Sequence, residues 1–171
     1  MLDLLRRRRS IRVFTDQPVE EDKKQDLLKA ALLAPSSKNK KSAELLVIED
    51  RAVIRRMAGC KKFGSTPLET APLAIVVMAD HEKSDVWVED ASLAAFCIQL
   101  EAESLGLGST WVQIRRREGD EGPADAVLKR ELSIPENRSI LCVIACGYKN
   151  EEKQPYTDED LDWSKVHDGS L

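Results

Sequence analysis

The chain has 171 residues, and its 26 lysine and arginine residues against 30 aspartate and glutamate residues give a formal net charge of -4 at pH 7. This length suits one compact domain over residues 1–171, and a composition of 42% hydrophobic and 33% charged residues can bury a core beneath a solvated surface. The acidic balance argues against a surface built to neutralise a nucleic-acid backbone, and the apolar content excludes disorder as the main state.

The first third of the chain predicts two helices and a polar turn. Residues 1–9 can form a short helix whose three leucines face the interior, and residues 11–14 are β-prone and extended. A second helix is expected over residues 19–33, because acidic residues fill its first turn and leucines recur along one face. Pro35 ends this helix, and residues 36–42 form a lysine-rich turn.

The middle of the chain predicts a strand at residues 45–48, a helix near residues 50–59, and an apolar strand at residues 73–79 of the kind that is covered on both faces. A long helix follows over residues 86–105. Its apolar stripe at helical spacing consists of Trp87, Ala91, Ala94, Ile98, Ala102 and Leu105. The small alanines permit close packing, either in the core of the subunit, which we favour, or at the seam of a dimer.

Gly106 and Gly108 bracket the end of the long helix, where a left-handed residue commonly terminates helices. The elements expected after it are a strand at 109–114, a loop at 120–123, a helix at 124–132 and a strand at 140–146. Strands separated by helices predict an α+β or α/β layered domain.

Residues 148–171 are acidic and lack apolar periodicity, which predicts an extended C-terminal arm. The arm nevertheless carries four apolar side chains, Tyr156, Leu161, Trp163 and Val166. Because exposing these groups to water is unfavourable, we expect the arm to wrap a partner subunit.

The four cysteines are Cys60, Cys97, Cys142 and Cys146. They form no Cys-x-x-Cys pair and no secretory leader is recognised ahead of them, so we expect reduced thiols in a cytoplasmic protein. A zinc site would need His81 or His167 from remote segments, and no metal site is predicted. No stretch approaches the ~20 apolar residues that a membrane span requires, so no membrane association is expected.

The run Arg8-Arg9-Ser10-Ile11-Arg12 combines guanidinium groups with a hydroxyl. Its residues Arg8, Ser10 and Arg12 occupy alternate positions, so they point the same way if the segment is extended. Guanidinium groups meet phosphate oxygens with paired donors, and serine adds a neutral donor. The run therefore predicts a site for a small phosphate monoester. A solvated helix end and a nucleic-acid contact are the alternatives.

The sequence lacks the motifs of common catalytic side chains. Its Gly106-x-Gly108 follows a helix and precedes a strand, the reverse of a dinucleotide fingerprint, and no Walker loop, metalloprotease helix or serine-hydrolase elbow occurs. His81 is expected in a surface turn and His167 in the tail. A phosphate site without titratable machinery is typical of an enzyme whose bound cofactor carries the reaction, so no catalytic residue is assigned.

Four motifs follow one another as in the nitroreductase family of FMN-dependent oxidoreductases, which the chain resembles over nearly its whole length. They are Arg8-Arg9-Ser10-Ile11-Arg12, Ala34-Pro35-Ser36-Ser37-Lys38-Asn39, Ala71-Pro72-Leu73-Ala74-Ile75-Val76 and Leu105-Gly106-Leu107-Gly108-Ser109-Thr110-Trp111. The resemblance implies an α+β fold with a mixed sheet flanked by helices. It also implies an intertwined homodimer with an extended C-terminal arm, in which two FMN sites at the subunit interface are each built from both chains.

The resemblance assigns cofactor contacts to four segments of this sequence. The phosphate and ribityl contacts are Arg8, Arg9, Ser10 and Arg12. The turn that approaches the isoalloxazine ring is formed by Pro35, Ser36, Ser37 and Asn39. The stretch that runs beside the ring, with backbone N–H near flavin N5, is Trp111, Val112, Gln113 and Ile114. In relatives a basic residue of the tail completes the phosphate site, and Lys153 is the nearest candidate.

The sequence departs from the family pattern after the serine turn. Family members commonly continue with Gln-Pro-Trp, whereas Lys41-Ser42-Ala43 stands here. The loss of the tryptophan and the added charge of Lys40 and Lys41 could reshape what enters the site. We therefore expect FMN binding to be retained and leave the acceptor open.

The resemblance implies a ping-pong cycle in which NADH or NADPH gives hydride to flavin N5 and a small electron-poor acceptor, such as a nitroaromatic or a quinone, takes it from the same face. A cation near N1 and the C2 carbonyl would stabilise reduced flavin, and Lys41 is one option. The alternative is a flavin-binding protein that senses or stores FMN, or uses it in a non-reductive reaction, without NAD(P)H turnover. Nucleic-acid binding by the arginine run is a third hypothesis and predicts affinity that falls steeply with salt.

Overall fold

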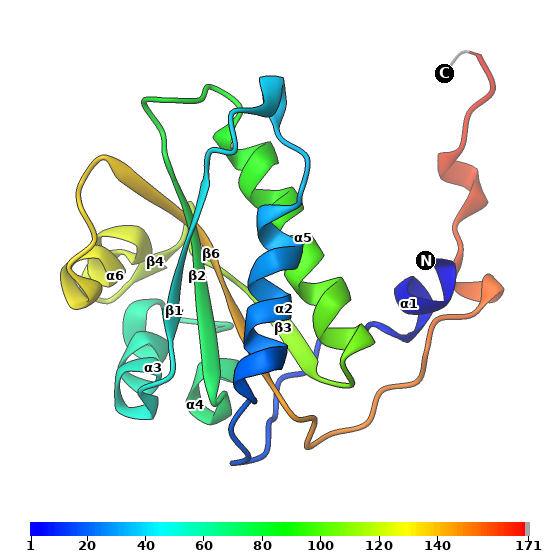
Figure 1. Ribbon diagram of the computed structural model, residues 1–171, viewed down its shortest axis with the longest axis horizontal. Helices are drawn as coiled ribbons and strands as arrows, with labels where there is room; N and C mark the ends of the chain where they lie inside the picture. The colour runs from blue at the N-terminus through cyan, green and yellow to red at the C-terminus, as the bar shows by residue number, and fades with distance from the viewer. Residues whose placement is uncertain (170–171) are drawn as a thin grey trace.

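The structure, a computed structural model, describes residues 1–169, so the last two residues of the expected arm lie outside the described part. A four-stranded sheet forms its centre, with strand order β1-β2-β6-β3 (Figure 1). These strands are β1 (Ala43–Ile48), β2 (Leu73–Asp80), β6 (Arg138–Gly147) and β3 (Gly108–Gln113). Each neighbouring pair is antiparallel, and within residues 1–169 the one parallel pairing is an isolated bridge between Ser10 and Ser109. The expected mixed sheet is thus antiparallel in its main ladder.

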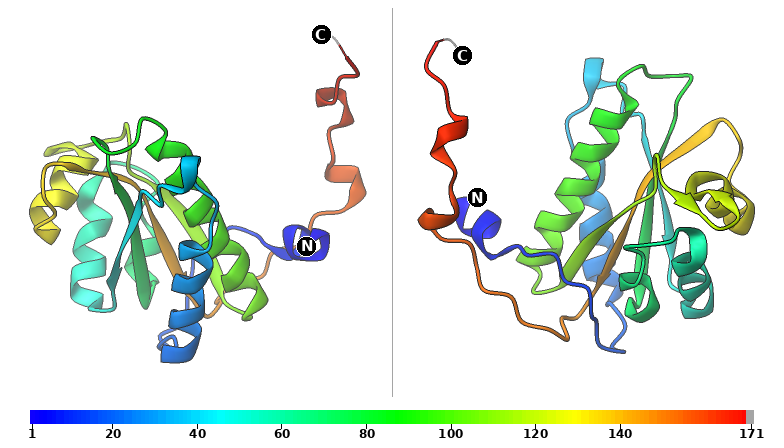
Figure 2. Two further views of the ribbon diagram at one scale, coloured as in Figure 1. Left: turned by 45° about the horizontal axis from the view of Figure 1, so that its top comes forward. Right: turned by 180° about the vertical axis from the view of Figure 1, so that it is seen from behind.

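Helices cover both faces of the sheet (Figure 2). One face carries α2 (Glu21–Leu32) and α5 (Trp87–Ser104), which pack against each other as well as on the sheet. The other face carries three shorter helices, α3 (Arg51–Met57), α4 (Pro67–Thr70) and α6 (Ala124–Leu132). The helix-flanked α+β fold is therefore confirmed.

Strand β2 contributes side chains to the hydrophobic cores on both faces of the sheet, because its side chains alternate between the two faces. Ile75 and Val77 pack with α2 and α5, whereas Ala74 and Val76 pack with α3, α4 and α6. All four side chains are fully buried. The prediction of a strand covered on both faces is confirmed.

Cys142 and Cys146 lie in β6 and share the core on the α5 side, as their even spacing predicted. Burial raises the pKa of the Cys146 thiol to about 12 and raises that of Cys142 as well. All four cysteines are free thiols, and Cys60 is also buried. The cysteines of β6 therefore act as small apolar core residues.

The small-residue stripe of α5 packs into the core, which confirms the interpretation we favoured. Its fully or nearly fully buried members are Ala91, Ala94, Ile98 and Ala102, and Trp87 and Leu105 pack at the rim of the same cluster. Another face of this helix is open, because Leu93 and Phe96 are 42% and 38% exposed.

The N-terminal helix α1 (Leu2–Arg7) stands apart from the sheet, beside the C-terminal segment (Figures 1 and 2). The expectation that its leucines face the interior of the chain was wrong: the helix has no buried residue, and Leu2 is 73% exposed. Instead, Leu2 and Leu5 line an open groove of about 600 Å³ together with Tyr156, Leu161 and Trp163 of the tail. Three leucines on one short helix identify an apolar face but not the surface that this face contacts.

The tail is extended, with two short 3-10 turns at Asp158–Asp160 and Trp163–Lys165. It pairs with the N-terminal segment, since the Tyr156 N–H donates to the carbonyl of Arg6 at 2.9 Å and Phe14 forms an antiparallel bridge with Lys149. Its apolar side chains Leu161, Trp163 and Val166 are 50%, 70% and 62% exposed. The two ends of the chain thus form one outlying unit with an exposed apolar surface.

The expected loop at 120–123 is the turn of a small hairpin, formed by β4 (Glu118–Gly119) and β5 (Gly122–Pro123). The helix expected near 50–59 is α3 followed by a 3-10 turn at Ala58–Cys60. None of the helices within residues 1–169 is both long and apolar enough to cross a membrane.

Candidate functional site

The arginine-rich segment lies along the start of β3. Besides the Ser10–Ser109 bridge, the Ile11 N–H donates to the Ser109 carbonyl at 3.0 Å, and Ile11 is buried. A Cβ atom on Gly108 would lie 2.9 Å from the Ile11 side chain, so glycine is required there for the close approach. Gly106, with φ 76°, is the left-handed residue after α5. The left-handed residue expected at the end of the long helix is therefore Gly106, while Gly108 begins β3 and is required for the close approach of Ile11.

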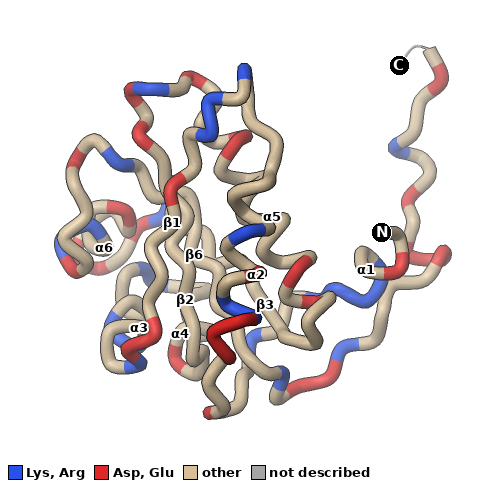
Figure 3. Tube along the Cα trace, in the orientation of Figure 1, with Lys and Arg blue, Asp and Glu red and all other residues tan. Residues whose placement is uncertain are grey.

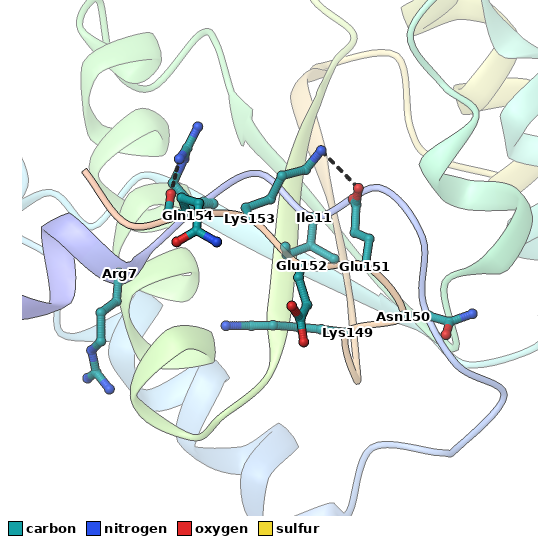
Figure 4. A pocket seen from close by; sticks show the side chains of 9 residues that line it. Arg7, Ile11, Lys149, Asn150, Glu151, Glu152, Lys153 and Gln154 are labelled. Carbon is teal, nitrogen blue, oxygen red and sulfur yellow. Dashed lines mark hydrogen bonds and ion pairs between the residues drawn. The ribbon is translucent and has the colours of Figure 1, made fainter. Parts of the chain in front are cut away.

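The basic residues of this segment divide between two sides. Arg7, Arg9 and Ile11 line a cavity of about 570 Å³ with residues 149–154 of the tail (Figure 4). Arg8, Ser10 and Arg12 do not line this cavity, as alternation along an extended backbone requires. Figure 3 shows the segment as a basic stretch between α1 and the sheet.

Lys153 reaches the same cavity, but its charge is paired. Its Nζ lies 2.9 Å from Glu151 Oε2 (Figure 4). Glu151 also accepts a hydrogen bond from the backbone N–H of Arg12. The Arg12 N–H, followed by Lys153, holds the pKa of Glu151 below its usual value. The Arg9 guanidinium donates to the Gln154 carbonyl and lies 4.2 Å from the centroid of the Tyr156 ring. The structure thus brings Arg9 and Lys153 to one cavity and holds Glu151 against Arg12.

The guanidinium groups of Arg8, Arg9 and Arg12 have no carboxylate within 4.0 Å in the described part of the chain. In contrast, Arg6 pairs with Asp158, and Arg7 pairs with Asp3 at 3.1 Å. Positive charge in the segment is therefore concentrated at the positions that the sequence assigns to a phosphate.

The serine turn joins α2 to β1 through a 3-10 turn at Ser37–Asn39. Its backbone is left-handed at Lys38, Asn39 and Lys41, with φ of 51°, 54° and 49°. The Ser36 hydroxyl accepts a hydrogen bond from the Lys41 N–H at 2.8 Å, which closes the loop across these residues. Ser36 and Ser37 are partly exposed, and Pro35 and Asn39 are exposed, so the turn lies at the surface.

The serine turn and the arginine segment lie at opposite ends of α5 (Figure 1). The turn is bonded to Asp90 in the first turn of the helix, and Ser10 pairs with Ser109, shortly after the helix ends at Ser104. At a rise of about 1.5 Å per residue, roughly 20 Å of helix separates the two ends. One chain therefore does not bring Pro35–Asn39 to Arg8–Arg12.

Strand β3 is an edge strand, and the segment predicted to run beside the ring lies on it. Backbone groups alternate in direction along an antiparallel strand, and the carbonyls of Ser109 and Gln113 both point away from β6, toward the Ile11 N–H and the Lys61 ammonium group. The Trp111 backbone, midway between them, faces the same free edge. The side chains of Val112 and Ile114 are fully buried in the core, and their backbone groups face β6, where the Ile114 N–H donates to the Leu141 carbonyl at 3.1 Å.

The sequence did not single out Lys61, which reaches the free edge of β3 from the loop after α3. Its Nζ donates to the Gln113 carbonyl at 2.8 Å, and the residue is only 9% exposed. Within residues 1–169 no carboxylate lies within 4.0 Å of this ammonium group, and burial lowers its pKa. No sequence signal marks this residue, because Lys61 and Lys62 look alike and only Lys62 forms an ion pair, with Asp120 at 3.4 Å.

The indole Nε1 of Trp111 donates to the Gln113 side-chain oxygen at 2.7 Å, and the Gln113 amide donates to the carbonyl of Arg115 at 2.8 Å. These bonds fix both side chains on the strand. Within residues 1–169 no three His, Cys, Asp or Glu side chains are grouped to hold a metal ion.

Known proteins resemble this chain in sequence and in fold. An FMN-dependent nitroreductase from Clostridium difficile R20291 is 48% identical and superposes with a TM-score of 0.98 over 100% of both chains. A protein of Archaeoglobus fulgidus with the provisional name NADH dehydrogenase/NAD(P)H nitroreductase is 37% identical over 163 residues, 93% of this chain and 91% of its own. An FMN reductase [NAD(P)H] from Bacillus subtilis is 27% identical over 125 residues, 59% of this chain and 49% of its own.

The fold and these likenesses define the class of the protein as an α+β oxidoreductase. The chain belongs to the nitroreductase family, whose family model matches residues 5–62 and 59–148. The resemblance stated from the four sequence motifs is thereby confirmed.

Proposed function

We propose that this protein is an FMN-dependent oxidoreductase that passes hydride from NADH or NADPH to a small electron-poor acceptor, such as a nitroaromatic or a quinone. The observation that carries the proposal is the free edge of β3. The arginine segment meets this edge at Ser109, the Trp111 backbone faces it midway, and the Lys61 ammonium group, which has no ion-pair partner within residues 1–169, lies at Gln113. An edge with an N–H donor and a nearby cation suits an electron-rich flat ring with a phosphate at one end.

The residues present fit FMN. The guanidinium groups of Arg8 and Arg12 lack ion-pair partners in the described chain, and Ser10 lies between them on the extended segment, so the three can bind a phosphate dianion. Arg9, on the tail side of the segment, adds positive charge near it, and Lys153 lines the same cavity with its charge paired to Glu151. The names of an FMN-dependent nitroreductase and an FMN reductase among the relatives support the same cofactor.

We propose a homodimer in which each site takes the arginine segment and β3 from one subunit and Pro35, Ser36, Ser37 and Asn39 from the other. Two observations support this arrangement. The serine turn and the arginine segment lie at opposite ends of α5, and a second copy would cover apolar groups that water now contacts on α5 and the tail. The C-terminal arm of residues 148–171 would then wrap the partner subunit, with the whole chain as one FMN-binding domain.

When bound, FMN would supply the hydride chemistry at N5, in a ping-pong cycle that uses one pocket for both substrates. The chain's own groups would bind and orient the cofactor. The arginines would hold the phosphate, the backbone N–H of Trp111 would meet the ring edge, and Lys61 would offset negative charge on the reduced flavin. No side chain of the chain is assigned a proton transfer. The four free thiols suit a reducing compartment such as the cytoplasm.

The test is an absorption spectrum of the purified protein, followed by anaerobic titration with NADH and with NADPH. We expect a yellow protein whose flavin is bleached by at least one nicotinamide and recoloured by a nitroaromatic or quinone. A protein that binds FMN but is bleached by neither nucleotide would support the alternative, a flavin-binding protein without NAD(P)H turnover. A colourless protein that takes up no added FMN would overturn both.

A further inference from the structure

Asp90 is a buried carboxylate that contacts both ends of the serine turn. It lies in the first turn of α5 and is 4% exposed. Its Oδ1 accepts a hydrogen bond from the Ser37 N–H at 2.8 Å, and its Oδ2 accepts one from the Ser42 hydroxyl at 2.6 Å. Each carboxylate oxygen is therefore bonded to a different end of the turn, and three of the four residues between 37 and 42 are left-handed.

Such a turn needs an external restraint. Residues with a Cβ atom disfavour the left-handed region, and Lys38, Asn39 and Lys41 all occupy it without being glycine. Inside the turn, the Ser36 hydroxyl bonds the Lys41 N–H, but this contact does not anchor the turn to the body of the protein. The two hydrogen bonds to Asp90 do anchor the turn to the body of the protein, because Asp90 belongs to α5 and α5 packs on the sheet.

The pocket beneath the turn is lined by Pro35, Ser36 and Lys41 together with Asp90 and Ala94 of α5. It holds only about 50 Å³, so the turn already lies close against the helix. A charge in such a site is tolerated because both of its oxygens are hydrogen-bonded.

From this geometry we infer that Asp90 is a positioning residue that holds the serine turn in the conformation that meets the cofactor. It touches no cofactor itself. The inference rests on the proposed function, since it assigns the turn a role only if FMN is bound. It adds a determinant of cofactor affinity that lies on α5, outside the four motifs.

The experiment compares four variants of the full chain: Asp90→Ala, Asp90→Asn, Ser42→Ala and Asp80→Ala. Asp80 is the matched control, because it is also 4% exposed and hydrogen-bonded, but to Arg138 and Asn137 rather than to the turn. Two readouts are taken, hydrogen–deuterium exchange of residues 36–42 in the FMN-free protein and the FMN dissociation constant.

Asp90→Ala should speed exchange at residues 36–42 about tenfold and raise the FMN dissociation constant about tenfold or more, because two charge-assisted hydrogen bonds are lost. Asparagine keeps one acceptor for the Ser37 N–H and can donate to the Ser42 hydroxyl, so Asp90→Asn should stay within about threefold of the wild type. Ser42→Ala should lie between them. Asp80→Ala should lower thermal stability and leave FMN affinity unchanged.

Several outcomes would overturn the inference. Unchanged exchange in Asp90→Ala would show that the turn needs no restraint from α5. Faster exchange with wild-type FMN affinity would show that the restraint has no bearing on the cofactor, and equal losses of affinity in Asp90→Ala and Asp80→Ala would indicate general destabilisation. If Asp90→Ala does not fold, the same two measurements on Ser42→Ala test the inference in its place. A wild-type protein that takes up no FMN would instead refute the proposed function, and the role of Asp90 with it, even if exchange behaved as expected.

Discussion

Lys61 Nζ lies 2.8 Å from the carbonyl oxygen of Gln113, which places a buried ammonium group on the free edge of the sheet. One carbonyl satisfies only one of its three N–H donors. A buried cation with unused donors and no carboxylate nearby in residues 1–169 is costly unless a ligand supplies the missing negative charge. Reduced flavin is a ligand of that kind.

Replacing Lys61 should therefore alter the redox behaviour of the bound flavin. In Lys61→Met we expect the midpoint potential to fall by about 30 mV or more, which corresponds to about tenfold in the equilibrium of a two-electron couple. Lys62→Met is the matched control, since Lys62 is exposed and paired with Asp120, and it should leave the potential unchanged. Equal potentials in Lys61→Met and the wild type would remove this lysine from the site.

The arginine segment should contribute to FMN affinity rather than to folding. The double variant Arg8→Ala/Arg12→Ala should raise the FMN dissociation constant by about a hundredfold or more, because each lost charge-assisted contact is worth about 1.5–3 kcal/mol. Arg55→Ala/Arg56→Ala, on the exposed side of α3, removes the same charge and should leave affinity unchanged. Full flavin occupancy in Arg8→Ala/Arg12→Ala would show that the phosphate binds elsewhere.

Gly108 should tolerate no side chain. A Cβ atom there meets Ile11, a buried residue that cannot easily move, so Gly108→Ala should lower the free energy of unfolding by about 1–3 kcal/mol. Gly59→Ala is the control, because nothing lies within 4 Å of the corresponding Cβ position. Urea unfolding of both variants checks this. A Gly108→Ala protein as stable as the control would mean that the N-terminal segment does not lie on β3.

The thiols of β6 should be inert in the folded protein. Burial raises the pKa of Cys146 to about 12 and also raises that of Cys142, so at pH 8 both remain protonated and inaccessible. An aromatic disulfide reagent should then leave these two thiols unmodified in the native protein and react with all four after unfolding. Prompt modification of Cys142, mapped by mass spectrometry, would contradict the buried position of β6.

The exposed apolar side chains of the tail should matter for assembly. Leu161→Glu/Trp163→Glu places charges on the apolar groove beside α1, and we expect it to shift the protein from dimer to monomer and to release FMN. Lys165→Glu, an exposed change on the same arm, should leave the dimer intact. Sedimentation velocity measures both. A wild-type monomer that binds FMN fully would argue against a site built from two chains.

The order of helices and strands could be predicted from the sequence because apolar periodicity is a local signal. The strand expected at 73–79 is β2, Leu73–Asp80, and the helix expected at 86–105 is α5, Trp87–Ser104. Strand direction is not encoded in such a pattern, so the antiparallel ladder could not be foreseen.

Residues of the candidate site could be predicted only where they belong to a recognisable sequence motif. Arg8–Arg12 and the serine turn stand in recognisable motifs, but Lys61 and Asp90 act through tertiary contacts that join residues 52 and 53 positions apart. The leucines of α1 were misplaced for a related reason. An apolar face does not show which surface it contacts, and here Leu2 and Leu5 line a groove with the tail rather than pack into the core.

Helix α5 works as a spacer, since it keeps the serine turn and the arginine segment of one subunit apart. Its length therefore sets the distance between the two half-sites of each subunit in the proposed dimer. Two additional turns would move these half-sites about 11 Å further apart, so that they would no longer meet those of the partner subunit. Proteins built on this scaffold should therefore hold the residue count of α5 almost constant.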